Sequence, residues 1–351
     1  MNRKHKIVAI SIAFAVSPLS FACSATPDAE IEQIGSASQA ITGPGPGFSV
    51  AYQTIGNLLA ELGKPAVATI MPGTSPSIMP LQSGGGVDMA FQDVHEGYLW
   101  LSTPAKFQNL YLGLDPASSP SITAMPGSGY QIAFQSNDHV LWVTGKTGTG
   151  PLGLPMMPGT SPAIAPRGST WEVAFQHANG NLWFAGDTGT FDTGEPMAPN
   201  TSPALISLNP SYGGFEAAFR HANGNLWIYG TESYKDTGYG VAPTTSPSIA
   251  KIPADQYGYE HFRIAFHANN DSEHLWVTGE SGGIVNDAVD TGYGLAPNTS
   301  PSIAVSRTNG STWEVAFQSL GTNRLWFYGT QATGSTGIRM AAGTSPSITA
   351  L

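Results

Sequence analysis

Cysteine is almost absent from this sequence, since Cys23 is the only one among 351 residues. The chain after it therefore has no disulfide and no cysteine nucleophile, and depends on packing for its stability. Charged residues make up only 11%, and no apolar run is long enough to cross a bilayer as a helix. The motifs HExxH, GxSxG and the phosphate-binding loop are also missing. We therefore expect no enzyme, no cofactor and no metal site.

The first 22 residues differ from the rest and predict a cleaved signal peptide. A basic start, Arg3 to Lys6, precedes the short apolar run Ile7–Val16, and Ser20-Phe21-Ala22 offers small residues to a signal peptidase. Cleavage removes three basic and no acidic residues, so the net charge changes from −10 to −13. A surface this acidic repels phosphate backbones, and we expect no nucleic-acid partner.

Cys23 follows the predicted signal peptide directly, at the position of the lipid-modified first residue of bacterial lipoproteins. The match is incomplete, because Leu19 stands four residues before the cysteine instead of three and Phe21 is bulky. Two alternatives stay open: plain secretion, or an outer-membrane or cell-surface lipoprotein of a bacterium. Residues 23–43 are small and polar and predict a flexible tether. Lipidation at Cys23 is the only membrane contact that the sequence suggests.

Three short phrases recur in fixed order along the rest of the chain. Thr-Ser-Pro-Ser-Ile or a close variant occurs seven times, with prolines at positions 76, 120, 162, 203, 247, 301 and 346. Ala-Phe-Gln or a variant also occurs seven times, beginning at residues 51, 90, 133, 174, 218, 265 and 316. Leu-Trp occurs six times, ending at Trp100, Trp142, Trp183, Trp227, Trp276 and Trp326. Repeats of this length, each with several short strands, are typical of a propeller.

Each unit has the pattern of antiparallel strands. Trp171–Gln176 alternates with period two, and Asn179-Gly180 then indicates a hairpin in which both residues take positive φ. Helical periodicity is missing after Val16, apart from a candidate turn near Leu58–Leu62. We predict an all-β, seven-bladed β-propeller over residues 44–351.

The ends of the repeat array predict how the ring closes. In every internal unit the Ser-Pro phrase precedes Ala-Phe-Gln, so the first unit lacks its own Ser-Pro strand. Residues Ser345–Leu351 have the right sequence to supply it. We expect this C-terminal strand to pair into the first blade, which removes the open ends that a linear array must cap.

The candidate ligand-binding residues lie beside the hairpin turns. We name the strands of a blade A (Ser-Pro), B (Ala-Phe-Gln), C (Leu-Trp) and D, so that B–C and D–A connections share one end. The polar residues His177, Asn179, His221 and Asn223 are then expected to line grooves between blades. The Asp-Thr-Gly elements at Asp192, Asp236 and Asp290 are expected on the opposite or outer side. Amide and imidazole groups suit sugar hydroxyls, and an indole face packs on a pyranose.

Each of these residues also has a structural interpretation. Candidate ligand contacts also include Trp142, Trp183, Trp227, Trp276 and Trp326, although packing between blades is the favoured interpretation of these tryptophans. The histidines suit a solvated position or a stabilised turn, and asparagine favours turns for its own reasons. Glu172, Glu216 and Glu314 occupy one repeat position, which spreads them around the ring and does not place two across one substrate.

The longest unit carries the only asymmetric insertions, Asp255–His261 and Glu280–Asp287. If the protein were a polysaccharide lyase or hydrolase, this blade would be the first place to look. Extended surface loops are the alternative interpretation.

The unit with Thr-Ser-Pro-Ser-Ile, Glu-Val-Ala-Phe-Gln and Gly-Asn-Leu-Trp resembles the repeat of bacterial fucose-binding seven-bladed propeller lectins. It is more distantly similar to tectonin and tachylectin-type repeats. The resemblance covers about residues 48–351 and implies weak sugar sites between adjacent blades that act together through avidity. The Asn-Gly-Asn turn, the Asp-Thr-Gly element and the glutamine after Ala-Phe depart from those lectins. We expect an exported carbohydrate-binding protein with glycans as partners, and keep a protein-interaction scaffold as the alternative.

Overall fold

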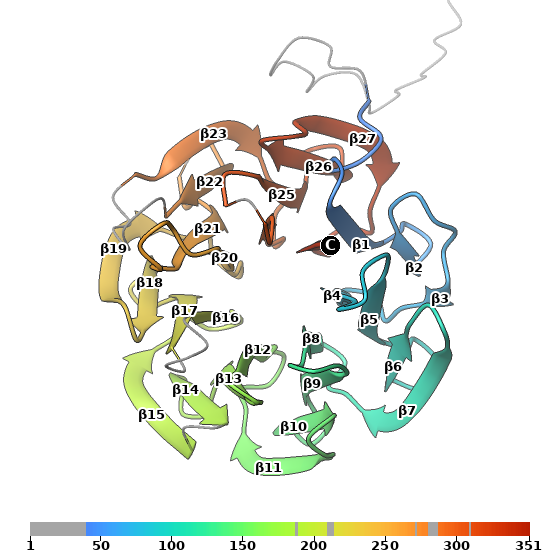
Figure 1. Cartoon of the computed structure of the whole chain (residues 1–351), viewed down its shortest axis with the longest axis vertical. Helices are drawn as coiled ribbons and strands as arrows, with labels where there is room; N and C mark the ends of the chain where they lie inside the picture. Colours follow the sequence, from blue (N-terminus) through green and yellow to red (C-terminus); the bar gives the residue numbers. More distant parts are fainter. Residues whose placement is uncertain (1–39, 187–188, 209–213, 271, 280–286, 309) are drawn as a thin grey trace, which may run out of the picture. The chain divides into compact units, whose positions relative to one another are not determined.

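The computed structural model describes residues 40–351 except 187–188, 209–213, 271, 280–286 and 309. The predicted signal peptide, Cys23 and residues 23–39 of the tether therefore lie outside the described residues. The described residues form a ring of seven four-stranded antiparallel sheets (Figure 1). This confirms the predicted seven-bladed β-propeller.

We number the blades 1 to 7 in chain order and give the strands of each from the innermost, A, to the outermost, D. Blade 1 has β28 (Ser347–Ala350), β1 (Phe48–Gln53), β2 (Leu58–Glu61) and β3 (Ala68–Thr69). Blade 2 has β4 (Ser77–Pro80), β5 (Val87–Gln92), β6 (Tyr98–Ser102) and β7 (Phe107–Gly113), and blade 3 has β8 (Ser121–Ala124), β9 (Tyr130–Gln135), β10 (Val140–Gly145) and β11 (Gly150–Pro155). Blade 4 has β12 (Ala163–Arg167), β13 (Thr170–Gln176), β14 (Asn181–Gly186) and β15 (Gly189–Pro196).

Blade 5 has β16 (Ala204–Leu208), β17 (Gly214–Arg220), β18 (Asn225–Gly230) and β19 (Tyr234–Gly240). Blade 6 has β20 (Ser248–Ile252), β21 (His261–His267), β22 (His274–Thr278) and β23 (Val289–Gly294). Blade 7 has β24 (Ser302–Val305), β25 (Trp313–Gln318), β26 (Arg324–Gly329) and β27 (Gly334–Arg339).

Blade 1 closes the ring as the sequence predicts. Its A strand is β28, which pairs antiparallel with β1 in a register that joins Phe48 to Ala350 and Ala51 to Ser347. At the other end of the described chain, the backbone N–H of Ile41 donates to the carbonyl of Ser335 in blade 7. The first and last blades are therefore joined by both ends of the chain.

The core lies between neighbouring blades. The phenylalanine of each Ala-Phe-Gln phrase is fully buried, as Phe91, Phe134, Phe175, Phe219, Phe266 and Phe317. Each hydrophobic cluster combines two adjacent sheets; one of them joins Val143 of blade 3 to Phe175 of blade 4. Stacking sheets in this way buries both faces of the central strands.

The Thr-Ser-Pro-Ser-Ile phrase forms a closed circle of hydrogen bonds around the channel. The serine before each proline donates its backbone N–H to the hydroxyl of the corresponding serine in the next blade, at 2.8 to 3.0 Å. The participants are Ser75, Ser119, Ser161, Ser202, Ser246, Ser300 and Ser345, and Ser345 donates to Ser75. We call this the serine ring. Because every link needs a small hydroxyl at the same place, the serine recurs in all seven units.

The second serine of the phrase makes an incomplete circle. Its hydroxyl accepts the backbone N–H of the isoleucine in the next blade, as Ser77 does from Ile122 at 3.1 Å. Blades 4 and 5 have Ala163 and Ala204 at this position, so these links are missing. The propeller therefore tolerates alanine at this position, because the fold forms without the hydrogen bond that the serine hydroxyl would accept.

The glutamine after Ala-Phe joins consecutive blades. Gln135 Nε2 donates to the carbonyl of Met157 at 2.9 Å, and the N–H of Met157 donates to the carbonyl of Gln176 in the next blade. Gln53, Gln92, Gln176 and Gln318 bind the corresponding carbonyls of their own D–A loops. This phrase thus has a structural role that accounts for its recurrence.

Two local expectations were wrong. Residues 58–61 form strand β2 and not a helical turn, because Leu59 occupies the buried position that the Leu-Trp leucine takes elsewhere. The Asn-Gly hairpins are not two-residue turns, since only Gly180 and Gly224 have positive φ and Asn179 and Asn223 do not. In each turn the N–H of the glycine donates to the carbonyl of the histidine three positions earlier, and the glycine is the left-handed residue.

Candidate functional site

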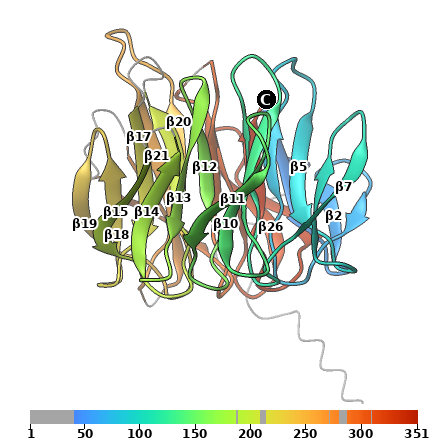
Figure 2. The ribbon, with the colours of Figure 1, turned by 90° about the horizontal axis from the view of Figure 1, so that it is seen from below.

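The B–C turns and D–A loops meet at one end of the propeller, as predicted. The N–H of Ala178 donates to the carbonyl of Pro155, and the N–H of Met197 to that of Gly180. The A–B connections and the C-terminus lie at the other end, which is the upper edge of Figure 2. We call these the turn end and the channel-mouth end.

The Asp-Thr-Gly elements lie on the outermost strands, which agrees with the expected outer placement, but near the turn end and not at the opposite end. The Asp192 carboxylate accepts hydrogen bonds from the amides of Asn179 and Asn181, each at 3.0 Å, and from the N–H of Gly194 at 2.8 Å. Thr193 donates to the carbonyl of Leu182. Partial burial raises the pKa of Asp192, but these hydrogen bonds outweigh it and hold the pKa below its ordinary value.

Blade 5 repeats this arrangement with Asn223, Asn225 and Asp236. Asn179 and Asn223 therefore hold the D strand against the hairpin. Their side-chain amides donate hydrogen bonds to the aspartates, so both asparagines have a structural role in the turn.

The two candidate histidines lie flat on the two candidate tryptophans of their own blades. The rings of His177 and Trp183 are 4.2 Å apart with an angle of 17°, and those of His221 and Trp227 are 4.3 Å apart with an angle of 18°. All six Leu-Trp tryptophans are half-buried, so each keeps some aromatic surface exposed while it packs in the blade. The tryptophans therefore pack in the blades as the structural interpretation expects, and ligand contact by their exposed surface stays a prediction.

The D strands vary in the residue three positions after the one that corresponds to Asp192, and this residue faces the next blade. It is Leu112, Leu154, Glu195, Tyr239, Tyr293 or Ile338 in blades 2 to 7. Tyr239 and Tyr293 contact the next tryptophans, Trp276 at 6.0 Å and Trp326 at 5.6 Å between ring centres. Trp142 packs beside Leu112 of blade 2. The interfaces are therefore related by the repeat but differ in chemistry.

The interface between blades 4 and 5 combines a carboxylate with aromatic rings. Glu195 Oε2 lies 3.6 Å from His221 Nε2, and the Tyr234 hydroxyl donates to Glu195 Oε1 at 2.5 Å. Tyr234 lies edge-on to Trp227 at 5.9 Å and is 61% exposed. The hydrogen bond to Glu195 raises the pKa of Tyr234, so the phenol stays protonated at neutral pH. We call Glu195, His221, Trp227 and Tyr234 the blade 4–5 cluster.

Sequence reasoning found His221 and Trp227 but missed Glu195 and Tyr234. Both lie on the irregular D strands, whose pairing with the C strands contains a bulge that the repeat phrases do not reveal. A glutamate where the other copies have leucine, tyrosine or isoleucine was the available signal.

The glutamates at one position of the B strands, Glu172, Glu216 and Glu314, are buried, and Glu216 and Glu314 accept hydrogen bonds from the C–D turns of their blades. Glu216 Oε1 accepts the N–H of Ser233, while its Oε2 is buried without a hydrogen-bond partner among the described residues. Burial raises the pKa of Glu216 to about 8 and that of Glu314 to about 7. Gln131 holds the same turn in blade 3 by accepting the N–H of Thr147.

The polar residues in the two insertions of blade 6 make hydrogen bonds and ion pairs within or next to their own loops. The Asp255 carboxylate accepts the N–H groups of Tyr257 and Tyr259, and Lys251 pairs with Glu260 at 2.9 Å. His261 lies 3.8 Å from Asp255. Asp287 accepts from Thr278 and Gly279, whereas Glu280 lies outside the described residues. Extended surface loops are therefore the interpretation that these contacts favour.

Two further searches covered only the described residues. In that part of the chain, no three His, Cys, Asp or Glu side chains come together as metal ligands. The same residues contain no helix with the length and apolar character needed to span a membrane.

The comparisons with known proteins give matches in structure only. No protein-family model matches the sequence, and no curated protein is significantly similar to it. A mutant of the Aleuria aurantia lectin solved with Fucalpha1-6GlcNAc has a TM-score of 0.52 and 15% identity, over 75% of this chain and 96% of that one. A triple-arginine mutant of AofleA from Arthrobotrys oligospora has a TM-score of 0.55 and 12% identity, over 79% and 88%.

A third solved structure, SapL1 lectin in complex with alpha methyl fucoside, has a TM-score of 0.52 and 12% identity, over 77% of this chain and 97% of that one. At these identities the similarity establishes a shared β-propeller fold. Propellers host unrelated functions, so the function has to be argued from the residues of this chain.

Proposed function

We propose that this protein is an exported lectin that binds carbohydrate between its blades, with its strongest site at the blade 4–5 cluster. The observation that carries the proposal is the cluster itself: a carboxylate, an imidazole, a phenol and an indole from two blades within contact of one another. An acidic hydrogen-bond acceptor beside a partly exposed aromatic face is the chemistry that sugars require.

The cluster is already oriented before a ligand arrives. Tyr234 and Glu195 hold each other by a hydrogen bond, and the His221 ring is fixed by its stacking on Trp227. Side chains ordered in this way lose little conformational freedom on binding. A single sugar residue is thereby offered hydroxyl partners on Glu195 and Tyr234 and an aromatic surface on Trp227.

A fucoside is the first ligand to test. The Aleuria aurantia and SapL1 structures that share this fold contain fucosides. Fucose also carries a methyl group where most hexoses carry a hydroxymethyl group, so one side of it suits an indole face.

The remaining interfaces are proposed as weaker sites. Those with Tyr239 and Tyr293 offer a second aromatic ring to Trp276 and Trp326, but have no carboxylate at the Glu195 position. Several unequal sites on one ring bind a clustered glycan more tightly than a free sugar, because the later contacts are intramolecular.

The site is tested by titrating the exported protein with methyl α-L-fucoside in a calorimeter. Glu195→Gln should weaken binding about tenfold or more, since a hydrogen bond to a charged group is worth roughly 1.5–3 kcal/mol. Tyr234→Phe should weaken it less. The matched control is Glu232→Gln, which neutralises an exposed carboxylate on the C–D turn of blade 5. Equal affinities for Glu195→Gln and Glu232→Gln would remove the blade 4–5 cluster from the binding site.

A further inference from the structure

Three cavities lie around the central channel at the channel-mouth end, away from the blade 4–5 cluster. Their volumes are about 450, 340 and 550 Å³. The first and second share Thr123, the second and third share Lys251, and the third and first share Arg307 and Thr349. The three cavities are therefore neighbours, and we call them together the channel chamber. Its parts have the size of small-molecule sites.

The wall of the channel chamber is mixed, with more apolar than polar surface. Six of the seven inner A strands contribute an aliphatic residue to it, namely Ile78, Ile122, Ile164, Leu205, Ile303 and Ile348. Polar side chains also line it, among them Gln82, Thr123, Ser207, Thr349 and Glu260. An alkyl chain is matched by the aliphatic part of this wall.

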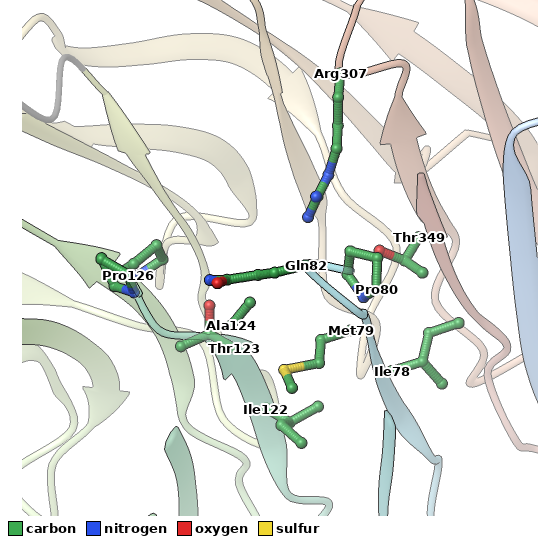
Figure 3. A pocket seen from close by; sticks show the side chains of 11 residues that line it. Ile78, Met79, Pro80, Gln82, Ile122, Thr123, Ala124, Pro126, Arg307 and Thr349 are labelled. Carbon is green, nitrogen blue, oxygen red and sulfur yellow. The ribbon is translucent and has the colours of Figure 1, made fainter. Parts of the chain in front are cut away.

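One cation points into this space. Figure 3 shows the Arg307 side chain extending into the cavity above Met79 and Ala124. Arg307 is exposed and has no carboxylate within ion-pair distance among the described residues. Lys251, the other cation of the chamber, is already paired with Glu260 at 2.9 Å. A guanidinium without an acidic partner beside aliphatic side chains favours a ligand that has both an anionic group and an apolar chain.

We propose that the channel chamber binds one medium-chain fatty acid, with its alkyl chain against the aliphatic wall and its carboxylate at Arg307. This site is separate from the blade 4–5 cluster and does not depend on carbohydrate binding. The wall provides affinity that grows with chain length, and the guanidinium provides the preference for an anion.

Calorimetric titration of the exported protein with octanoate, decanoate and dodecanoate, below their micelle concentrations, tests the proposal. Each buried methylene contributes about 0.8 kcal/mol, so affinity should rise roughly three- to fourfold per methylene with one site per chain. Non-saturable binding, or an affinity that does not change with chain length, would overturn the proposal.

Two variants test the position of the ligand. Arg307→Gln should weaken decanoate binding roughly three- to tenfold and leave the binding of decanol unchanged. Lys106→Gln, which removes an exposed cation from the C–D turn of blade 2, is the matched control and should change neither. Thr123→Phe places a larger side chain in the shared wall and should prevent binding of both ligands. Near-ultraviolet circular dichroism verifies that each variant is folded.

The outcomes separate this proposal from the carbohydrate site. If decanoate binds as tightly to Arg307→Gln as to the unchanged protein, the assignment of the head group is wrong. If Thr123→Phe still binds, the chamber is not the site. Saturating decanoate should leave the affinity for methyl α-L-fucoside unchanged, and competition between them would contradict two separate sites.

Discussion

The hydroxyl of Ser75 accepts a hydrogen bond from the backbone N–H of Ser345, a residue 270 positions further along the chain, at 3.0 Å. This contact is the last link of the serine ring, and it joins the repeats at the two ends of the array. Two contacts therefore hold the C-terminal segment in place: β28 pairs with β1 inside blade 1, and Ser345 is bound to Ser75 of the next blade.

The serine ring should contribute measurably to stability. Ser75→Ala removes the acceptor of the part-buried N–H of Ser345, and such a loss costs about 1 kcal/mol. Ser77→Ala removes a link of the incomplete second circle, which already has alanine in two blades, and should cost less. Guanidinium unfolding of both variants measures the difference. Equal losses would show that the two circles are equivalent.

Removal of residues 345–351 should destabilise the protein far more than the loss of seven terminal residues usually does. The deletion removes strand β28, the buried Ile348 and the last link of the serine ring together. We expect a loss of more than about 4 kcal/mol in the free energy of unfolding. Deletion of Leu351 alone, which loses one backbone hydrogen bond, is the control. A seven-residue truncation that unfolds at the same denaturant concentration as the control would contradict ring closure by the C-terminus.

Stability should depend on pH through Glu216. Its folded-state pKa of about 8 lies above the ordinary value of 4.5, so folding favours the protonated carboxyl. The stabilising contribution is complete below about pH 4.5 and is lost as the pH rises through 8. Glu216→Gln keeps the acceptor for the turn, as Gln131 does in blade 3, and removes the ionisation.

The free energy of unfolding of Glu216→Gln should therefore rise relative to that of the unchanged protein, by roughly 1–3 kcal/mol between pH 5 and pH 8. Thermal or denaturant unfolding at a series of pH values measures the difference. Parallel curves for the two proteins would show that Glu216 does not titrate in this range.

The hydrogen bond between Asn179 and Asp192 in blade 4 should contribute to stability and not to sugar binding. Asn179→Ala removes one of the hydrogen bonds to Asp192 and should lower the free energy of unfolding by about 1 kcal/mol or less, because the pair is exposed. Sugar affinity should stay the same. A large loss of binding with unchanged stability would return Asn179 to the candidate ligand contacts.

The repeat phrases were enough to predict the number of blades, the strand order and the closure of the ring. Each phrase recurs because it makes the same kind of contact in most or all blades: the serine ring has seven links, and the side-chain contact of Gln135 with its own D–A loop is repeated by Gln53, Gln92, Gln176 and Gln318. The candidate site was only half predictable. His221 and Trp227 belong to the repeat phrases, whereas Glu195 and Tyr234 lie on D strands whose bulged register is set by the Asp236 contacts and not by hydrophobic alternation. The turn type failed because Asn179 serves as a side-chain donor to Asp192.

Binding of the protein without its predicted signal peptide to an array of immobilised glycans tests the central claim most directly. We predict binding to a restricted set of glycans with fucose at exposed ends, stronger on dense spots than on sparse ones, and reduced for Trp227→Ala and Glu195→Gln. No signal on any glycan at high protein density would contradict a lectin function and favour a protein-interaction scaffold.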